Sequence, residues 1–341
     1  MLRISEVPRE VLEVMELLNN NGYRAYLVGG CVRDMLLGKR PNDYDICTDA
    51  TPNIVKGLFG FVIPTGENYG TMTVESKGMF VEVTTMCKSI IKNEVVGTTE
   101  KFERVVFTNS LLEDLSRRDF TINAMAMGLD GVLYDYFNGK EDLENRIIKS
   151  VNSANDRFKE DALRMMRAIR FSCQLNFVID SETYYSIYCY RELINNVAPE
   201  RIRKELNKIL ISDNPSLGIV NIMTTGLLEI ILPELSACNG FNQYNKNHNK
   251  DVFGHTMSVL ESTPRNLNVR LAALLHDIGK PKTFSIDERG EGHFYGHHKV
   301  GADMAREALK RLKYDNKTID TVAILVYEHL FRHKKLKEAT I

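Results

Sequence analysis

Two aspartates near the start of the chain have the spacing of a metal-dependent site for phosphate chemistry. Asp43 and Asp45 flank a tyrosine and lead into an apolar segment. If this segment is a strand, alternate residues point to one face and both carboxylates lie together there. Such hard oxygen ligands suit Mg²⁺, which binds a few carboxylates together with substrate phosphates. The pair therefore predicts a two-metal site that activates a 3′-hydroxyl and stabilises the leaving pyrophosphate.

A glycine turn precedes the aspartates and is suited to binding the phosphates of a nucleotide. An apolar strand pattern ends at Val28, Gly29 and Gly30 follow, and a helical pattern then begins. Backbone N–H groups in such a turn, together with the positive end of the helix, can bind phosphate oxygens. Arg33 adds a charged donor in the first helical turn. Because similar turns are common without a ligand, this prediction depends on the aspartates that follow.

A third carboxylate is expected to orient the attacking hydroxyl. Glu82 is our candidate, because it lies in an alternating pattern over residues 79–85 that predicts a strand. Glu75 and Asp119 are alternatives, since periodicity does not choose among the three.

Histidines in the last third of the chain predict a second metal site. His276 and Asp277 follow the apolar helical run of residues 271–275. The adjacent His–Asp pair with flanking histidines resembles the HD phosphohydrolase superfamily. The resemblance implies a metal set of His255, His276 and Asp277, with His297 as a further ligand. Imidazole and carboxylate ligands together suit Mn²⁺, Ni²⁺, Fe²⁺ or Mg²⁺ better than structural zinc. The bound ion would activate water against a phosphoester.

The elements that position these residues change in character along the chain. The first part mixes helical and strand patterns and predicts an α+β domain with a small mixed sheet. Beyond residue 156 strand patterns almost vanish, and an Asn-rich stretch at 239–249 predicts a loop between two helical modules. We therefore expect a catalytic domain over 1–150, a helical nucleotide- and RNA-binding domain over 151–238, and an HD-type domain over 239–341. The predicted helices are 8–18, 32–37, 157–171, 181–190, 199–211 and 217–227, and the predicted strands are 25–28, 71–75, 79–85, 105–107 and 132–136.

Composition excludes several classes of protein. The 341 residues exceed one ordinary core. The sequence has no apolar run of membrane-spanning length and no signal-peptide pattern, so a cytoplasmic protein without membrane contact is expected. Six cysteines without CxxC spacing favour reduced, mostly buried thiols. The net charge of −1 means that a nucleic-acid partner would need local basic surfaces. Candidate basic runs lie at 164–170, 201–204 and 334–337.

Five ordered blocks resemble class II CCA-adding enzymes and related bacterial poly(A) polymerases. They span about half the chain. The resemblance implies template-independent addition of C and A from CTP and ATP to the tRNA acceptor end, with Mg²⁺ and without a stable protein partner. The blocks are LVGGCVRDMLLGKRPNDYDICTDATP (27–52), DLSRRDFTINAMA (114–126), DYFNGKEDLENRIIKSV (135–151), RFKEDALRMMRAIRF (157–171) and APERIRKELNKIL (198–210).

The resemblance also implies roles for individual residues around the triphosphate. Gly30 and Arg33 would contact the nucleotide, and Asp43 and Asp45 would hold Mg²⁺. Residues Arg118 and Asp119 would meet the phosphate and the ribose.

A second set of residues would recognise the base. The resemblance assigns the base edge to Asp161 and Arg164, with Arg167 and Arg170 assisting. Residues three apart are neighbours on one helix face. A carboxylate can accept a hydrogen bond from the exocyclic amine of a base, and a guanidinium can donate one to an acceptor atom of the base ring. Cytosine and adenine share that pattern, so one pair could select both. The alternative is an ordinary intrahelical salt bridge.

Departures from the family pattern leave alternatives open. Met86-Cys87 replaces an aromatic residue and an arginine, and residues 88–103 fall where family members have a mobile loop used in switching from C to A addition. Addition of CCA, of CC only or of A only therefore remain alternatives. The chain ends at Ile341, earlier than expected for a family whose helical tail binds the tRNA elbow. Competing functions are poly(A) polymerase, an HD phosphohydrolase acting on RNA 3′ or cyclic phosphates, and an inactive RNA-binding protein.

Overall fold

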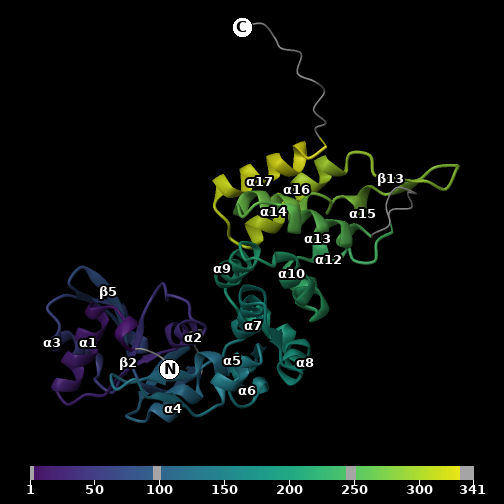
Figure 1. Cartoon of the computed structure of the whole chain (residues 1–341). Coiled ribbons are helices and arrows are strands. Elements are labelled where there is room, and N and C mark those ends of the chain that lie inside the picture. Colours follow the sequence, from purple (N-terminus) through teal and green to yellow (C-terminus); the bar gives the residue numbers. More distant parts are fainter. Residues whose placement is uncertain (1–3, 95–100, 243–250, 331–341) are drawn as a thin grey trace, which may run out of the picture. The chain divides into compact units, whose positions relative to one another are not determined.

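The chain divides into two compact units, Met1–Arg157 and Phe158–Ile341. The computed structural model describes residues 4–94, 101–242 and 251–330 (Figure 1). The basic run at 334–337 and most of the Asn-rich stretch lie outside these ranges. Within the described ranges, the structure has no helix that combines the length and the apolar character needed to cross a membrane.

The first unit is built on a seven-stranded mixed sheet, as predicted. Its strand order is β3-β4-β5-β2-β1-β8-β9. The β2–β5 pair is parallel and the other neighbours are antiparallel. The strands are β1 (Ala25–Val28), β2 (Asp45–Thr48), β3 (Val62–Gly66), β4 (Thr71–Ser76), β5 (Met79–Thr85), β8 (Met125–Met127) and β9 (Leu133–Asp135).

Helices and a separate ribbon complete this unit. α1 buries Val11, Val14, Met15 and Leu18, which repeat at helical spacing and form its apolar face. β6 and β7 form a two-stranded antiparallel ribbon over much of the segment where a mobile loop was expected. Residues 95–100 of that segment lie outside the described ranges. The elements are α1 (Arg9–Asn20), α2 (Gly30–Leu36), α3 (Pro52–Leu58), β6 (Cys87–Glu94), β7 (Lys101–Phe107), α4 (Leu111–Ser116), α5 (Gly139–Glu144) and the short β10 (Ile147–Ile148).

The β4–β5 hairpin follows the predicted turn at Lys77-Gly78. Both residues have positive φ, 49° and 84°. Such a turn matches the right-handed twist of paired strands and therefore fixes their register. The register pairs Thr73 with Glu82, so the turn sets where Glu82 stands in the sheet.

The second unit is helical, apart from β11 (Val178–Ile179) and the small hairpin of β12 (Ser285–Ile286) and β13 (Gly292–His293). The chain enters it within α6. The helices are α6 (Ala154–Glu160), α7 (Leu163–Leu175), α8 (Ser181–Tyr190), α9 (Pro199–Leu210), α10 (Pro215–Thr224), α11 (Leu227–Ile231), α12 (Pro233–Ser236), α13 (Val252–Ser262), α14 (Leu267–Leu275), α15 (Lys280–Thr283), α16 (His297–Arg311) and α17 (Asn316–Glu328).

The prediction of one continuous helix over 157–171 was wrong. α6 ends at Glu160 and α7 begins at Leu163, so Asp161 lies in a break. The Asp161 carboxylate accepts a hydrogen bond from the Leu163 backbone N–H (3.2 Å), and its carbonyl accepts one from Arg164 N–H (3.0 Å). A short acidic side chain that bonds nearby N–H groups commonly starts a helix anew, a local effect that hydrophobic periodicity does not reveal.

Candidate active sites

Three carboxylates gather at one face of the sheet in the first unit. β2 and β5 are parallel neighbours with Asp45 opposite Glu82, so both side chains point to the same face. Burial raises the pKa of Asp45 and of Glu82, and the charge of Asp43 adds to both shifts. The Arg118 charge opposes the shift at Asp45. The group therefore has mutual repulsion that a cation would relieve.

The prediction that Asp43 and Asp45 share a strand needs a correction. β2 begins at Asp45, and Asp43 lies in a bend two residues earlier, where it is exposed. The bend and the strand still leave the two charges close enough to raise the pKa of Asp45. The two carboxylates therefore lie near each other, but a bend before β2 places Asp43 there rather than strand alternation.

The alternative third carboxylates are engaged elsewhere. Glu75 accepts a hydrogen bond from the Gly78 backbone N–H within the β4–β5 turn (2.5 Å). Asp119 is buried and accepts bonds from the Phe120 N–H (2.8 Å) and the Asn123 amide (3.1 Å). The strand register favours Glu82 as the partner of Asp45.

Gly29 brings the start of α2 against the charged groups. Its φ is 81°, and a Cβ at this position would stand 3.2 Å from Arg118 Nη1 and 3.9 Å from Asp45 Oδ2. A side chain would therefore be strained by the backbone and would crowd the Arg118 guanidinium. The glycine turn, the carboxylates and Arg118 thus form one site, whereas Gly30 opens α2 beside the guanidinium of Arg33.

An amide that sequence reasoning missed links two predicted residues. Arg33 Nη1 donates to Asn123 Oδ1 (2.7 Å), and Asn123 Nδ2 donates to Asp119 Oδ1 (3.1 Å). Arg118 is held separately by the buried Asp114, 3.2 Å away. Asn123 lies in the block at 114–126, but only the fold shows that it contacts Arg33, ninety positions earlier in the chain.

The residues predicted to read the base have other partners in the structure. Asp161 Oδ2 accepts from Arg201 Nη2 of α9 (2.8 Å), and Arg164 Nη1 donates to Glu160 (3.0 Å). The expectation that residues 161 and 164 share a helix face is wrong, because Asp161 lies in the helix break. Arg167 is half-buried with its guanidinium 5.5 Å from the centre of the Phe171 ring.

Arg170 is committed to packing. Its Nε lies 2.6 Å from Oε2 of Glu205 on α9, and both side chains are buried. The Arg170 guanidinium also lies 4.0 Å from the Phe171 ring centre. A buried ion pair between two packed helices indicates a structural role rather than the predicted contact with the nucleotide.

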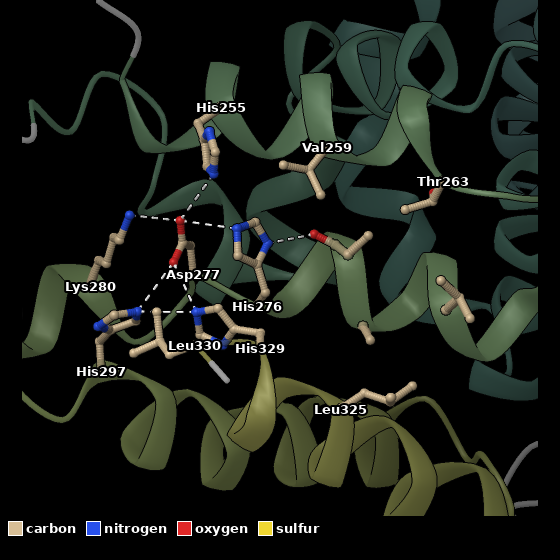
Figure 2. A pocket seen from close by; sticks show the side chains of 13 residues that line it. His255, Val259, Thr263, His276, Asp277, Lys280, His297, Leu325, His329 and Leu330 are labelled. Carbon is tan, nitrogen blue, oxygen red and sulfur yellow. Dashed lines mark hydrogen bonds and ion pairs between the residues drawn. The ribbon is translucent and has the colours of Figure 1, made fainter. Parts of the chain in front are cut away.

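The second unit carries a cluster of histidines around one buried aspartate (Figure 2). Asp277 Oδ2 lies 3.1 Å from His276 Nε2 and 3.8 Å from His255 Nε2. Oδ1 lies 3.4 Å from His297 Nε2 and 3.7 Å from His329 Nε2. In the described residues, groups of three side chains with ligand atoms within 4.8 Å of one another occur at His255–His276–Asp277 and at Asp277–His297–His329. The four predicted ligands are therefore brought together, and His329 joins them.

Backbone carbonyls orient three of these imidazoles. Nδ1 of His276, His297 and His329 lies 2.8, 2.8 and 2.6 Å from the carbonyls of Ala273, Phe294 and Val326. A ring nitrogen facing a carbonyl carries its proton, which leaves Nε2 of the neutral ring as the metal-binding atom. All three Nε2 atoms face Asp277.

The aspartate is electrostatically suited to remain charged. Burial alone would raise the pKa of Asp277, but the neighbouring side chains of His276, His297 and Lys280 hold this pKa well below its usual range. Lys280 Nζ lies 2.8 Å from Oδ2. A carboxylate surrounded by imidazoles is the donor set of a divalent transition metal.

Gly279 allows α16 to approach this centre. A Cβ on Gly279 would lie 2.2 Å from the His297 carbonyl oxygen and 2.7 Å from the backbone nitrogen of Gly301. Only glycine fits, so the residue two positions after Asp277 determines how close His297 comes. The sequence places this glycine beside the His–Asp pair but does not show which helix it admits.

Known proteins match both units. Residues 25–149 match the family described as the poly A polymerase head domain, residues 176–238 match the probable RNA and SrmB-binding site of polymerase A, and residues 252–341 match the HD domain.

Curated relatives are CCA-adding enzymes. The CCA-adding enzyme of Limosilactobacillus reuteri is 43% identical over 226 residues, which cover 66% of this chain and 54% of the relative. That of Levilactobacillus brevis is 44% identical over 223 residues, with 65% and 54% covered. The chain spans about half the length of these relatives.

Solved structures agree in fold over nearly the whole chain. The Bacillus stearothermophilus CCA-adding enzyme in complex with CTP is 32% identical, with a TM-score of 0.68 and coverage of 94% of this chain and 70% of that one. A tRNA nucleotidyltransferase complexed with a primer tRNA and an incoming ATP analogue shares the fold at 24% identity, with a TM-score of 0.62 and coverage of 96% and 87%. With both units matched in sequence and in fold, the chain belongs to the family of CCA-adding enzymes.

Proposed function

We propose that this protein adds C and A nucleotides from CTP and ATP to the 3′ end of tRNA without a nucleic-acid template. The observation that carries the proposal is the in-register pair of Asp45 and Glu82 beside Gly29 and Arg118. Relatives give its substrate class, since one solved structure holds CTP and another holds a primer tRNA with an ATP analogue.

The carboxylate face fits Mg²⁺. Its donors are oxygens alone. Burial and, to a lesser extent, the neighbouring carboxylates raise the pKa values of Asp45 and Glu82, and a hard divalent cation would stabilise their charged forms. On this proposal Asp43 and Asp45 hold the ion and Glu82 orients the tRNA 3′-hydroxyl. The bound ion supplies charge neutralisation of the triphosphate and a lowered pKa for that hydroxyl.

Neighbouring residues position the nucleotide. We assign the triphosphate to the backbone of Gly29 and Gly30 and to Arg33, whose guanidinium is oriented by Asn123. Arg118, anchored on Asp114, and Asp119 are assigned to phosphate and ribose. Fixed donors aimed at a phosphate need little reorganisation during the reaction, which makes their charge stabilisation effective.

Base selection is assigned to Asp161 and Arg164, with Arg167 nearby. In the structure the first two are paired with Arg201 and Glu160. Partly exposed ion pairs contribute at most about 1 kcal/mol, so a base edge can replace those partners at small cost. On this proposal the cytosine or adenine amine takes the place of Arg201 at Asp161, and the ring acceptor takes the place of Glu160 at Arg164.

We also propose a domain organisation and a cellular location for the protein. We infer a catalytic domain over 1–150, a helical nucleotide- and RNA-binding domain over 151–238, an HD-type domain over 239–341, and a cytoplasmic site of action. The clustering of contacts into two units supports a boundary near the first of these limits.

Nucleotide incorporation tests the activity. Three tRNA transcripts, ending at the discriminator base, at C and at CC, are incubated with Mg²⁺ and labelled CTP, ATP or both. We expect addition that stops once the terminal A has been added, and the accepted transcripts separate CCA, CC-only and A-only enzymes. Unlimited A addition to arbitrary RNA would instead establish poly(A) synthesis, and no incorporation with any transcript would refute the proposal.

A second activity is proposed for the histidine cluster. The ligand set of His255, His276, Asp277 and His297 supports a divalent ion, Mn²⁺, Ni²⁺, Fe²⁺ or Mg²⁺, and a phosphohydrolase acting on RNA 3′ or cyclic phosphates. Metal analysis of protein loaded with each ion tests the site. If protein that adds nucleotides normally retains none of these ions, the proposed metal site is rejected.

A further inference from the structure

Helix α9 is held near both of its ends by side chains from other helices of the second unit. It packs against α7 and against α14. Near its start, Arg201 Nη2 donates a hydrogen bond to Asp161 Oδ2 (2.8 Å). Its last residue, Leu210, lies nine positions later, which is about 14 Å along the helix axis. The contacts at this far end therefore determine where the end that contacts Asp161 lies.

Arg270 of α14 holds the last turn of α9. Its side chain is buried, and Nη1 donates to the backbone carbonyls of Leu210 (2.5 Å) and Ser212 (2.8 Å). Nη2 donates to the carbonyl of Thr263 (3.2 Å), which follows α13. The last carbonyls of a helix have no partner within the helix, and they form the negative end of its dipole. A buried guanidinium at this place therefore fixes the end of α9 to α13 and α14.

Tyr314 makes a second contact, one turn earlier along α9. It lies in the turn between α16 and α17 and is buried. Its hydroxyl donates to Asn207 Oδ1, and the guanidinium carbon of Arg203 lies 5.6 Å from the centre of its ring. Both of these partners belong to α9. Two separate elements that follow residue 250 in the chain thus hold the second half of α9.

The first half of α9 determines the direction of the Asp161 carboxylate. Asp161 lies in the break between α6 and α7, where its carboxylate accepts from the Leu163 backbone N–H (3.2 Å) and from Arg201. The buried pair of Arg170 and Glu205, with 2.6 Å between Nε and Oε2, fastens α9 to α7 beside this break. Because no continuous helix fixes Asp161, the position of α9 controls where its second oxygen points.

We propose that Arg270 and Tyr314 are positioning residues for base selection, which fix α9 so that α9 fixes the Asp161 carboxylate. This inference rests on the proposed role of Asp161 and deepens it. It gives α14 and the turn between α16 and α17 a part in the choice of nucleotide. Arg270 and Tyr314 do not belong to the groups of possible metal ligands found among the described residues, so this role does not require a metal ion.

A fixed carboxylate matters more for rejecting the wrong base than for binding the right one. Cytosine and adenine present an amine where uracil and guanine present a carbonyl oxygen. A carboxylate held in place attracts the amine and repels the carbonyl oxygen. A carboxylate that turns freely binds the amine less well, and it also moves away from the carbonyl oxygen. Loosening α9 should therefore lower the preference for the correct nucleotide, in addition to any effect on rate.

The ratio of kcat/KM for CTP to that for UTP measures this preference on a tRNA transcript that ends at the discriminator base. ATP against GTP, on a transcript that ends in CC, makes the same comparison for purines. Arg270→Met should lower these ratios about tenfold or more, because a misplacement of about 1 Å can cost about a hundredfold. Tyr314→Phe loses one hydrogen bond and should lower them about threefold. Arg311→Met is the matched control, because Arg311 joins α16 to Glu234 of α12 (2.8 Å) rather than to α9, and its ratios should stay within about twofold of the wild type.

A conservative substitution and an exchange measurement separate positioning from general stability. Asn207→Leu removes the acceptor of the Tyr314 hydroxyl and should behave like Tyr314→Phe, whereas Asn207→Asp keeps an acceptor and should behave like the wild type. Hydrogen–deuterium exchange of peptides over 161–170 should rise in Tyr314→Phe and Arg270→Met but not in Arg311→Met. Thermal melts followed by circular dichroism identify unfolded variants, and if Arg270→Met unfolds, Tyr314→Phe and Asn207→Leu decide the question.

The outcomes separate this inference from the proposed function. If the wild type adds nucleotides and folded Tyr314→Phe and Asn207→Leu keep its nucleotide ratios, the positioning role is overturned. An equal fall of the ratios in Arg311→Met would also overturn it, because the loss would then follow from general loosening. If the wild type adds no nucleotide to any transcript, the proposed function fails, and unchanged exchange over 161–170 in Tyr314→Phe would independently refute the contact of α9 with Asp161 as the controlling one.

Discussion

The first-unit site depends on which carboxylate stands beside Asp45. Parallel register puts Glu82 there, whereas Glu75, on the neighbouring strand, bonds to its own hairpin turn. We therefore expect Glu82→Gln to lower kcat for nucleotide addition about a hundredfold, the usual effect of losing a positioned acid–base group. Glu75→Gln keeps an oxygen for Gly78 and should stay within about twofold. Single-turnover incorporation of CTP measures both, and a larger loss in Glu75→Gln would reverse the assignment.

The thiols give a residue-scale test of the fold. The six cysteines are free, and Cys189 on α8 is exposed whereas the others are buried. Burial raises the pKa of Cys31 to about 11 and that of Cys238 to about 12, which suppresses their thiolates at neutral pH. Native protein should therefore react rapidly with one equivalent of a disulfide reagent at pH 8, and Cys189→Ser should abolish this phase. Two or more fast thiols in the wild type would contradict the burial pattern.

The sequence predicted which residues are candidates for chemistry better than it predicted which residues contact one another. Asp43, Asp45 and the His276–Asp277 pair could be found because their types and short spacing are themselves the signal. Asn123 could not, and His329 was not included in the predicted metal set, because each comes near its neighbours only through the fold. Glu82 is an intermediate case. The strand that contains it was predictable, but its position opposite Asp45 depends on the β4–β5 hairpin turn and on the parallel pairing of β5 with β2, which the sequence pattern does not reveal.

At the scale of elements, the packing of α7 against α9 contains a buried ion pair between Arg170 and Glu205. Arg170→Met should destabilise the protein by about 3–5 kcal/mol, because Glu205 would be left buried and unpaired. The double variant Arg170→Met/Glu205→Leu should recover most of that loss. Urea unfolding measures both, and KM for CTP in the double variant should stay within about twofold. A large rise in KM in a stable double variant would restore the nucleotide-binding role to Arg170.

Element boundaries were predictable where periodicity alone sets them. α8 over residues 181–190 and β1 over residues 25–28 match their predicted limits, and the β4–β5 hairpin turns at the predicted glycine. The break between α6 and α7 escaped prediction because apolar spacing continues through it. There, one acidic side chain at Asp161 competes with the helix for backbone N–H groups, and local bonding overrides the periodic pattern.

At the scale of the whole molecule, the two candidate sites lie in separate compact units. The carboxylate face lies in the first unit and the histidine cluster in the second, so no described residue belongs to both. Substitutions in sites that share no residues and no partners usually act additively. Asp45→Asn should therefore lower nucleotide addition by about a thousandfold or more, as expected for losing several kcal/mol of charge stabilisation, while the metal content of the histidine cluster stays unchanged.

The reciprocal substitution is made at Asp277 in the histidine cluster. Asp277→Asn should empty the histidine cluster and leave kcat/KM for CTP addition to tRNA within about twofold of the wild type. Both variants are measured in both assays on the same preparations. His293→Gln is the neutral reference, because His293 pairs with Asp287 beside the β12–β13 hairpin and lies outside the histidine cluster. If Asp277→Asn also lowers nucleotide addition more than about tenfold without changing the melting temperature, the two sites are coupled. The second unit would then take part in tRNA addition rather than carry an independent reaction.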